Sequence, residues 1–366
     1  MVRQSAWMVR FAWRRGDFRV SSKPRRIFDE DHAAFRDSVK RFIATDVAPN
    51  LEAWRDANET PRSVVAAAGE AGFLGTAVPE EFGGGGADDF GFLTVLIEET
   101  IAAGATGLAA LWALQAGVAI PFLLDHATAA DKRRWLPGLS AGQLIAVPAP
   151  ATLSNVVAGR IADALLVTAD DAVTLVALDR PGIAVAPIDE NLAGRDAGLA
   201  DITLSDLDAG TEIASPGTLR RDIDLWFAVL ALASARAATA LAVDYVHARK
   251  VFGRPLAEFE NTQFRLAELW AEVAGQTAFV DSCVHARSTG TLDAADAAAA
   301  CLTATRVCGQ AVDQSLQLHG GYGYMREYPI SHAFADARFL QVMASSYSNP
   351  HETLASTAAL DTMSQQ

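Results

Sequence analysis

The pattern of hydrophobic residues changes twice along the chain. Over residues 27–139 the apolar positions recur at the three- and four-residue spacing of amphipathic helices. Over residues 144–216 short apolar runs alternate with Pro, Gly and Asp, which favours short strands joined by turns. Long alanine-rich helical stretches return after Thr218 and run as far as Leu318. This order predicts a mainly α fold of the α+β class, with a small β domain in the middle.

The same changes of pattern predict the domain boundaries. We expect an N-terminal helical domain over residues 23–142, a shortened middle β domain over 143–217 and a C-terminal helical domain over 218–366, the last built as a four-helix bundle. Residues 1–22 are rich in Arg and Trp and nearly free of acidic residues. We interpret this segment as a disordered transit-type leader or as a start assigned too far upstream, and it has no place in the predicted fold.

Two apolar stretches are long enough to be tested as membrane spans. Residues 101–124 contain no charged side chain, but five residues predict two shorter helical pieces: Gly104, Gly107, Gln115, Gly117 and Pro121. The second stretch, residues 226–243, carries Arg236 in its middle. We therefore expect core helices of a cytoplasmic protein and no membrane span.

Composition excludes several classes of function. Among the 366 residues, 51% are hydrophobic, which is enough for a substantial core, and the formal charge of −14 would repel a nucleic-acid backbone. The three cysteines, Cys283, Cys301 and Cys308, have neither Cys-x-x-Cys spacing nor neighbouring histidines. We expect no nucleic-acid partner and no metal site, and buried thiols in a reducing compartment.

Four short motifs occur in an order that is specific. They are Val-Pro-Glu-Glu-Phe-Gly-Gly at 78–84, Trp-Leu-Pro at 135–137, the string from Tyr245 to Pro255 (Tyr-Val-His-Ala-Arg-Lys-Val-Phe-Gly-Arg-Pro), and His-Gly-Gly-Tyr-Gly-Tyr at 319–324 followed by Glu-Tyr-Pro at 327–329. With these motifs the chain resembles the acyl-CoA dehydrogenase family over nearly everything after Ile27. The resemblance implies bound FAD, an acyl-CoA substrate oxidised to enoyl-CoA, and an oligomer, usually a tetramer.

The resemblance also locates the catalytic base. Removal of the α-proton of a thioester needs a positioned carboxylate while hydride leaves the β-carbon for the flavin. The family usually supplies the Glu of a Glu-Gly-Thr string, and that position is Ala344 here. The sequence therefore predicts no catalytic residue at the usual place.

Some relatives place the glutamate earlier, before an arginine at the start of a long helix. Those two positions correspond to Ile223 and Asp224. Asp224 or Asp222 could act as a displaced base, but we favour carboxylates stabilised by the dipole at a helix N-terminus. Asp336 and Glu327 match acids that the family keeps for structure.

The flavin motifs are lost in one part of the chain and kept in another. In the middle domain the ring-binding strings are replaced by a segment with Thr152 and Ser154, which we interpret as a turn, and no Trp occurs between Trp135 and Trp226. The C-terminal half keeps the family positions that contact the FAD pyrophosphate and adenine of a neighbouring subunit: Arg249, Phe252, Gln317, Gly320 and Gly321. Arg suits phosphate, and glycines allow close backbone approach. The glutamine that follows in the family is Glu260 here, with Gln263 nearby.

The chain lacks the family's catalytic base and ring-binding strings but keeps the positions that contact the pyrophosphate and adenine. Together these features predict one subunit of a heteromeric acyl-CoA dehydrogenase. The chain resembles the base-lacking subunit of the actinobacterial enzymes of steroid or side-chain degradation, and its partner would be a homologous subunit carrying the catalytic Glu. The alternatives are a self-sufficient homo-oligomer using Asp222 or Asp224, a non-catalytic scaffold of the same fold, and a flavin monooxygenase that needs no thioester base.

Overall fold

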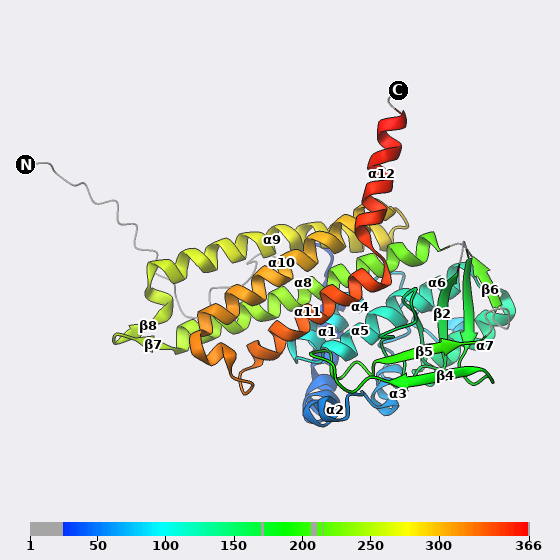
Figure 1. Ribbon diagram of the computed structural model, residues 1–366, viewed down its shortest axis with the longest axis horizontal. Helices are drawn as coiled ribbons and strands as arrows, with labels where there is room; N and C mark the ends of the chain where they lie inside the picture. The colour runs from blue at the N-terminus through cyan, green and yellow to red at the C-terminus, as the bar shows by residue number, and fades with distance from the viewer. Residues whose placement is uncertain (1–24, 170–171, 206–210, 215, 365–366) are drawn as a thin grey trace, which may run out of the picture.

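The computed structural model describes residues 25–169, 172–205, 211–214 and 216–364, and shows a mainly helical molecule with a small β region at one end (Figure 1). The predicted class, helical then β then helical, is confirmed. The segment 1–22, interpreted as a leader, lies outside the described residues.

The N-terminal helices pack into one layered unit. Their order is α1 (Glu30–Phe42), the π-helical turn η1 (Ile43–Val47), α2 (Leu51–Ala57), α3 (Arg62–Glu70), the short turn η2 (Glu80–Phe82), α4 (Gly91–Ala102), α5 (Thr106–Leu114), η3 (Gln115–Ala119), α6 (Ile120–His126) and α7 (Ala129–Ser140). Asp29 caps α1 in a reciprocal arrangement, because its carboxylate accepts the His32 N–H and the His32 ring bonds the Asp29 N–H.

The predicted break in the long apolar stretch occurs at one of its five candidate positions. Gly104 has a φ of +86° between α4 and α5, a conformation that suits glycine. At Gly117 and Pro121 the prediction was wrong, since the helix continues there through the wider turn η3. The indole of Trp226 lies against Gly117, where an added Cβ would come within 2.5 Å of the ring, and its Nε1–H donates to the Gly117 carbonyl at 2.7 Å. Gly117 thus serves close packing.

The β region contains two small sheets. Strands β1 (Ala146–Pro148), β2 (Ala164–Ala169), β3 (Ala172–Ala177) and β6 (Thr211–Ala214) form one sheet in that order, with β1 parallel to β2 and the other pairs antiparallel. Strands β4 (Ile183–Pro187) and β5 (Ala200–Leu204) form an antiparallel ribbon. Figure 1 shows this ribbon at the lower right of the molecule, far from the left-hand end of the long C-terminal helices.

The C-terminal helices form the elongated part of the molecule. They are α8 (Gly217–Ala248), α9 (Glu260–Ser288), α10 (Ala294–His319), α11 (Pro329–Tyr347) and α12 (Pro350–Ser364), with the hairpin β7 (Lys250–Val251) and β8 (Arg254–Pro255) and the turns η4 (Leu256–Glu258) and η5 (Gly320–Tyr324) at one end. Helices α8 to α11 run alongside one another, and α12 projects away from them (Figure 1).

Both stretches tested as membrane spans lie inside the protein. In the segments Thr106–His126 and Gly217–Ala248, 89% and 78% of the most apolar 18-residue window is buried. The three cysteines are buried as well. These positions agree with the predicted core helices.

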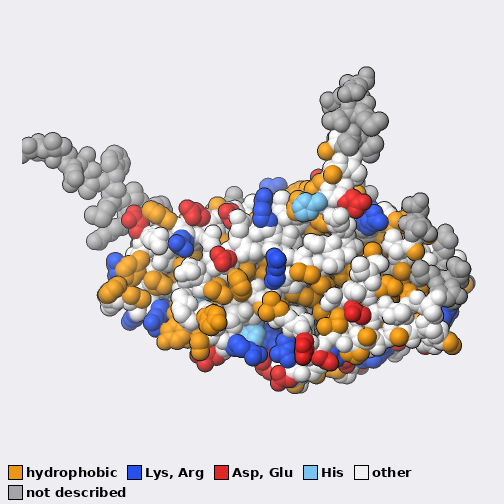
Figure 2. All heavy atoms as spheres, viewed as in Figure 1, with side chains coloured by type: hydrophobic (Ala, Val, Ile, Leu, Met, Phe, Trp, Pro, Cys, Tyr) orange, Lys and Arg blue, Asp and Glu red, His pale blue; other side chains and the backbone are white. Residues whose placement is uncertain are grey.

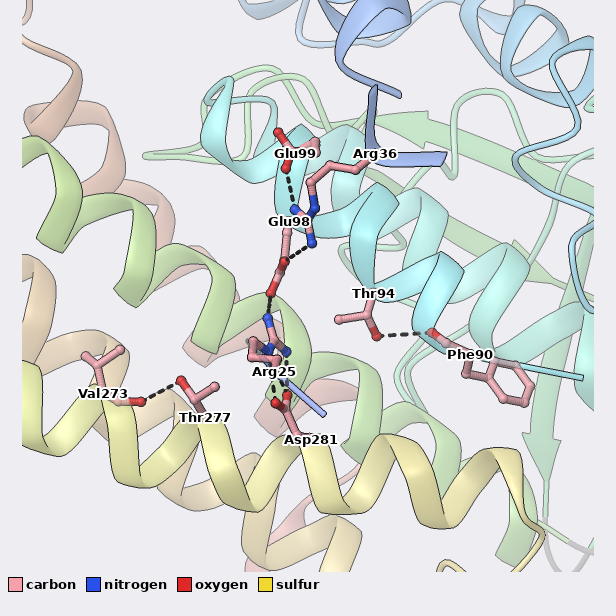
Figure 3. A network of polar contacts seen from close by, with 9 residues as sticks. All are labelled: Arg25, Arg36, Phe90, Thr94, Glu98, Glu99, Val273, Thr277 and Asp281. Carbon is pink, nitrogen blue, oxygen red and sulfur yellow. Dashed lines mark hydrogen bonds and ion pairs between the residues drawn. The ribbon is translucent and has the colours of Figure 1, made fainter. Parts of the chain in front are cut away.

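A buried network of ion pairs ties the start of the described chain to the bundle (Figure 3). Arg25 pairs with Glu98 of α4 and with Asp281 of α9, where its Nε lies 2.9 Å from one carboxylate oxygen. Arg36 of α1 reaches Glu98 at 2.9 Å and also pairs with Glu99. Because carboxylates and guanidinium groups alternate, each buried charge has a partner of opposite sign.

Candidate functional site

A cavity of about 520 Å³ lies at the end of the bundle that carries the β7–β8 hairpin and η5. Four of the five predicted cofactor-binding residues line it, namely Arg249, Gln317, Gly320 and Gly321. Figure 2 shows hydrophobic side chains gathered at this end of the molecule. The fold therefore brings the ends of α8 and α10, which are distant in sequence, around one space.

The end of α8 positions Arg249 at this cavity. Arg249 is the first residue after the helix, and its N–H still donates to the Tyr245 carbonyl at 2.8 Å. Its own carbonyl accepts the Leu256 N–H at 2.8 Å, which closes the chain around the β hairpin. The guanidinium carbon lies 5.2 Å from the centre of the Tyr322 ring. This cation–π contact holds a positive charge at the cavity wall.

Gly320 ends α10 in a conformation that disfavours a side chain. Its φ is +58° with ψ −139°, and the next residues form η5. Added Cβ atoms at Gly320 and Gly321 would meet no atom within 4 Å, so internal packing does not require these glycines. The backbone conformation explains Gly320, and the bare backbone of both residues leaves room for a ligand.

An aromatic wall continues the cavity. The Tyr245 ring stacks on the His319 ring with centroids 4.2 Å apart, and Tyr328 meets both edge-on. Burial lowers the pKa of His319, and its Nδ1 lies 2.7 Å from the Ser315 carbonyl. A neutral imidazole with the proton on Nδ1 satisfies that contact. Sequence reasoning missed this wall because its members become neighbours only in the folded chain.

Phe252 lies at the tip of the β7–β8 hairpin and is 93% exposed. It and Gly253 form the two-residue turn with φ values of +50° and +82°. Positive φ at both central positions is typical of a type I′ turn, where Asn-Gly is favoured and a bulky residue is strained. Phe252 therefore projects into solvent in a backbone conformation that is unfavourable for a bulky residue. It lies outside the cavity wall itself.

The adenine-side residues Glu260 and Gln263 occupy the start of α9. Glu260 is the first residue of that helix, where a carboxylate suits the helix dipole. Gln263 donates from Nε2 to the Ala257 carbonyl at 3.1 Å. These roles are local to the turn η4 and the helix.

The base position is part of the packed core. Ala344 lies inside α11 and is 3% exposed. One turn later the Tyr347 hydroxyl accepts the buried Val157 N–H at 2.8 Å, and the Tyr347 ring packs near Phe227 with centroids 5.7 Å apart. Ala344 is therefore a closed apolar position, and it carries no carboxylate of its own.

The two candidate displaced bases have different environments. Helix α8 begins at Gly217, so neither lies in its first turn, and the explanation from the helix dipole was wrong. Asp222 is held by Arg287, whose Nε and guanidinium nitrogen lie 3.0 Å from its two oxygens, and by Arg221. Asp224 is 1% exposed, and burial raises its pKa to about 6, against smaller lowering effects from its neighbours Ser348 and Cys301.

The remaining residues named in the sequence analysis lie in the core, at the cavity rim and in a turn. Asp336 is buried and accepts the Gly194 N–H at 3.0 Å, while Glu327 is exposed at the rim of the 520 Å³ cavity. Thr152 accepts the Ser154 N–H at 3.4 Å, as in the expected turn. Among the described residues no group of three His, Cys, Asp or Glu side chains is placed to hold a metal ion.

Comparison with known proteins gives the family. Residues 29–143 match the sequence model described as acyl-CoA dehydrogenase, N-terminal domain, and residues 225–344 match that of the acyl-CoA dehydrogenase C-terminal domain. Together these segments make up more than half of the chain. The chain belongs to the acyl-CoA dehydrogenase family, whose general reaction is the FAD-dependent desaturation of acyl-CoA.

Relatives and solved structures extend over nearly the same region. The long-chain specific mitochondrial acyl-CoA dehydrogenase of Rattus norvegicus is 29% identical over 363 residues, covering 86% of this chain and 83% of its own. An acyl-CoA dehydrogenase from Geobacillus kaustophilus superimposes with a TM-score of 0.83 at 24% identity, covering 92% and 100%. A glutaryl-CoA dehydrogenase from Mycobacterium smegmatis in complex with FADH2 gives 0.81 at 20%, covering 92% and 95%.

Proposed function

We propose that this chain is one subunit of a heteromeric FAD-dependent acyl-CoA dehydrogenase. It would contribute the pyrophosphate and adenine half of a flavin site shared with a homologous partner subunit. The observation that supports this most is the contrast between an open cavity lined by Arg249 and a base position, Ala344, packed into the core.

The cavity residues suit the phosphate and adenine end of FAD. Arg249 supplies a guanidinium that can donate two parallel hydrogen bonds to phosphate oxygens. Gly320 and Gly321 leave room for backbone N–H groups to approach the anion, and Phe252 and Gln317 would contact the remainder of the dinucleotide. When bound, the flavin accepts the hydride in this family's reaction.

The partner would supply what this chain lacks. Ala344 has no carboxylate to take the α-proton of the thioester, so the base must come from the other subunit. The middle domain offers a turn at Thr152 and Ser154 where the family holds the ring, so the ring would also lie against the partner. One flavin for each pair of chains follows from this division.

The test measures flavin retention in the co-expressed complex. Arg249→Ala removes a charge-assisted contact with phosphate, which contributes about 1.5–3 kcal/mol, so FAD should bind roughly ten- to a hundred-fold more weakly while assembly survives. Flavin absorbance per complex after gel filtration reports the loss. Arg306→Ala, at an exposed position in the middle of α10, is the matched control and should retain full flavin. Equal flavin in the Arg249→Ala and wild-type complexes would refute the shared site.

A self-sufficient homo-oligomer is the second candidate, and Asp224 favours it. A buried carboxylate with a pKa of about 6 has the acidity of a tuned general base, and its Oδ1 has no hydrogen-bond partner among the described residues. This candidate requires the chain alone to be yellow and to oxidise an acyl-CoA, with the activity abolished in Asp224→Asn. Asp222→Asn is the less informative variant, because Asp222 already pairs with Arg287.

The lone chain and the complex together separate the remaining alternatives. Flavin bound only with a homologous partner supports the shared site. Colourless protein in both preparations supports a non-catalytic scaffold, and a yellow lone chain without acyl-CoA oxidation supports a monooxygenase. Cytoplasmic location and a catabolic role in steroid or side-chain degradation belong to the same proposal.

A further inference from the structure

The outer edge of β4 is an unpaired strand edge. Strand β4 pairs with β5 on one side, and no described strand or segment pairs with its other side. The far side of β5 is covered instead, since Ala200 and Val156 exchange hydrogen bonds there at 2.8 and 3.2 Å. Figure 1 shows β4 on the rim of the molecule.

The ladder shows which backbone groups of β4 face outward. The Gly182 carbonyl accepts the Ser205 N–H at 3.1 Å, and the Ile188 N–H donates to the Leu199 carbonyl at 3.0 Å, so even-numbered residues bond toward β5. Because alternate residues of a strand bond to opposite sides, Ile183, Val185 and Pro187 direct their backbone groups outward. The free edge thus offers two N–H donors and three carbonyl acceptors.

This edge lacks the usual protection against pairing. Natural edge strands carry charged residues, bulges or covering loops. Strand β4 reads Ile-Ala-Val-Ala-Pro, without a charge, and pairs with β5 in regular register. Its last four residues are exposed, with Val185 at 40%. Only Pro187, which has no N–H, limits further pairing.

We propose that a second copy of this chain pairs with this edge, β4 against β4 in antiparallel orientation around a two-fold axis at Val185. In this register each Val185 N–H donates to the other Val185 carbonyl, and each Ile183 N–H donates to the Pro187 carbonyl of the other copy. All the outward donors are then satisfied, and the missing N–H of Pro187 removes only one further bond on each side.

Charges just beyond the two ends of β4 support this occupant and its antiparallel direction. Arg180 precedes Val185 by five residues and Glu190 follows it by five. Arg180 lies in the bend before β4 and Glu190 just beyond its other end, so an antiparallel second copy brings the end with Arg180 toward the end with Glu190, and the same attraction occurs twice. Asp189 is already bonded to Arg160 within the chain at 2.5 Å, which leaves Glu190 as the complementary acid.

The paired edge is independent of the proposed flavin site. The β4–β5 ribbon and the β7–β8 hairpin lie toward opposite ends of the molecule in Figure 1. A second copy on β4 therefore leaves the cavity at Arg249 open to a different subunit. Loss of either contact should not remove the other.

Cysteine crosslinking of the full-length chain tests the register. In the proposed pairing Ala184 of one copy faces Ala186 of the other, in a pair whose Cα atoms lie about 4.5 Å apart, within the range of a disulfide. Ala184→Cys alone and Ala186→Cys alone should stay monomeric on non-reducing gels under mild oxidation. A mixture of the two, one labelled with ¹⁵N, should give a disulfide dimer whose intact mass contains one of each. The native cysteines are buried and give a low background.

A charge exchange tests the occupant by sedimentation. Arg180→Glu should raise the dissociation constant of the copy-to-copy dimer about ten-fold, Glu190→Arg should do the same, and the double variant should restore it. Crosslinking of Ala184→Cys with itself would overturn the register, since it requires an axis at residue 184. A chain that is monomeric at all concentrations and gives no crosslink in the mixture would overturn the proposal.

Discussion

The buried carboxylate of Asp224 makes a sharp prediction about stability and pH. Its side chain is 1% exposed, and its Oδ1 has no hydrogen-bond partner among the described residues. Burial raises its pKa from the ordinary value of 3.8 to about 6, against the smaller opposing effects of Ser348, Cys301 and Arg220. Asp224→Asn keeps the shape of the side chain and removes the charge.

The sign follows from proton linkage. Below a pH of about 3.8 Asp224 is protonated in both the folded and the unfolded chain, so its ionisation does not lower the free energy of unfolding. Between that pH and about 6 the unfolded chain releases the proton while the folded chain keeps it, so the folded state loses stability as pH rises. The shift of about two pKa units corresponds to roughly 3 kcal/mol, fully present above pH 6. The asparagine variant escapes this penalty.

The assay is the difference in melting temperature between Asp224→Asn and wild type, measured from pH 4 to pH 8. We expect the difference to grow by about 4 °C in favour of the variant, with most of the change between pH 4 and 6. Asp336, whose pKa burial also raises to about 6, is present in both proteins and cancels. Asp244→Asn, at an exposed position on the same helix, is the control and should show no such trend. A difference that is constant with pH, or that shrinks as pH rises, would refute the reasoning.

Two further predictions concern the ends of the bundle. Arg25→Ala leaves Glu98 and Asp281 buried with one partner fewer, so the free energy of unfolding in urea should fall by about 3–5 kcal/mol, whereas the exposed neighbour Arg26→Ala should have little effect. Phe252→Asn relieves the left-handed backbone strain at the hairpin tip, so the free energy of unfolding should rise by on the order of 1 kcal/mol. The same variant should lower the flavin content of the complex. A variant less stable than wild type would contradict the inference that Phe252 is strained.

The order of elements was predictable because each change of residue pattern has a local cause. Alanine-rich periodic stretches give α8 to α10, and the Pro, Gly and Asp between apolar runs give the turns of the β region. The break in the apolar stretch was only partly predictable. Gly104 needs its positive φ for the chain to turn, whereas Gly117 needs only to be small beside Trp226, a partner more than a hundred residues away.

The candidate site was likewise predictable only in part. Arg249 and Gly320 were identified from short motifs at the ends of helices, where the string itself determines the local geometry. The stacking of Tyr245 on His319 depends on how α8 and α10 pack, which no local pattern reveals. The environments of Asp222 and Asp224 were missed for the same reason, because Arg287 of α9 and Ser348, which follows α11, are distant in sequence.

Helix α8 carries a consequence for motion. It runs for 32 residues, about 48 Å at 1.5 Å per residue, and after Gly217 it contains neither glycine nor proline. Helices kink at such residues or at π-bulges, and α8 has neither in its interior. Asp224 near one end and Arg249 just beyond the other are therefore joined by a continuous helix that has no kink site. Any opening at the cavity must come from the η5 turn, the hairpin or whole subunits moving as rigid bodies, while the bundle keeps its length.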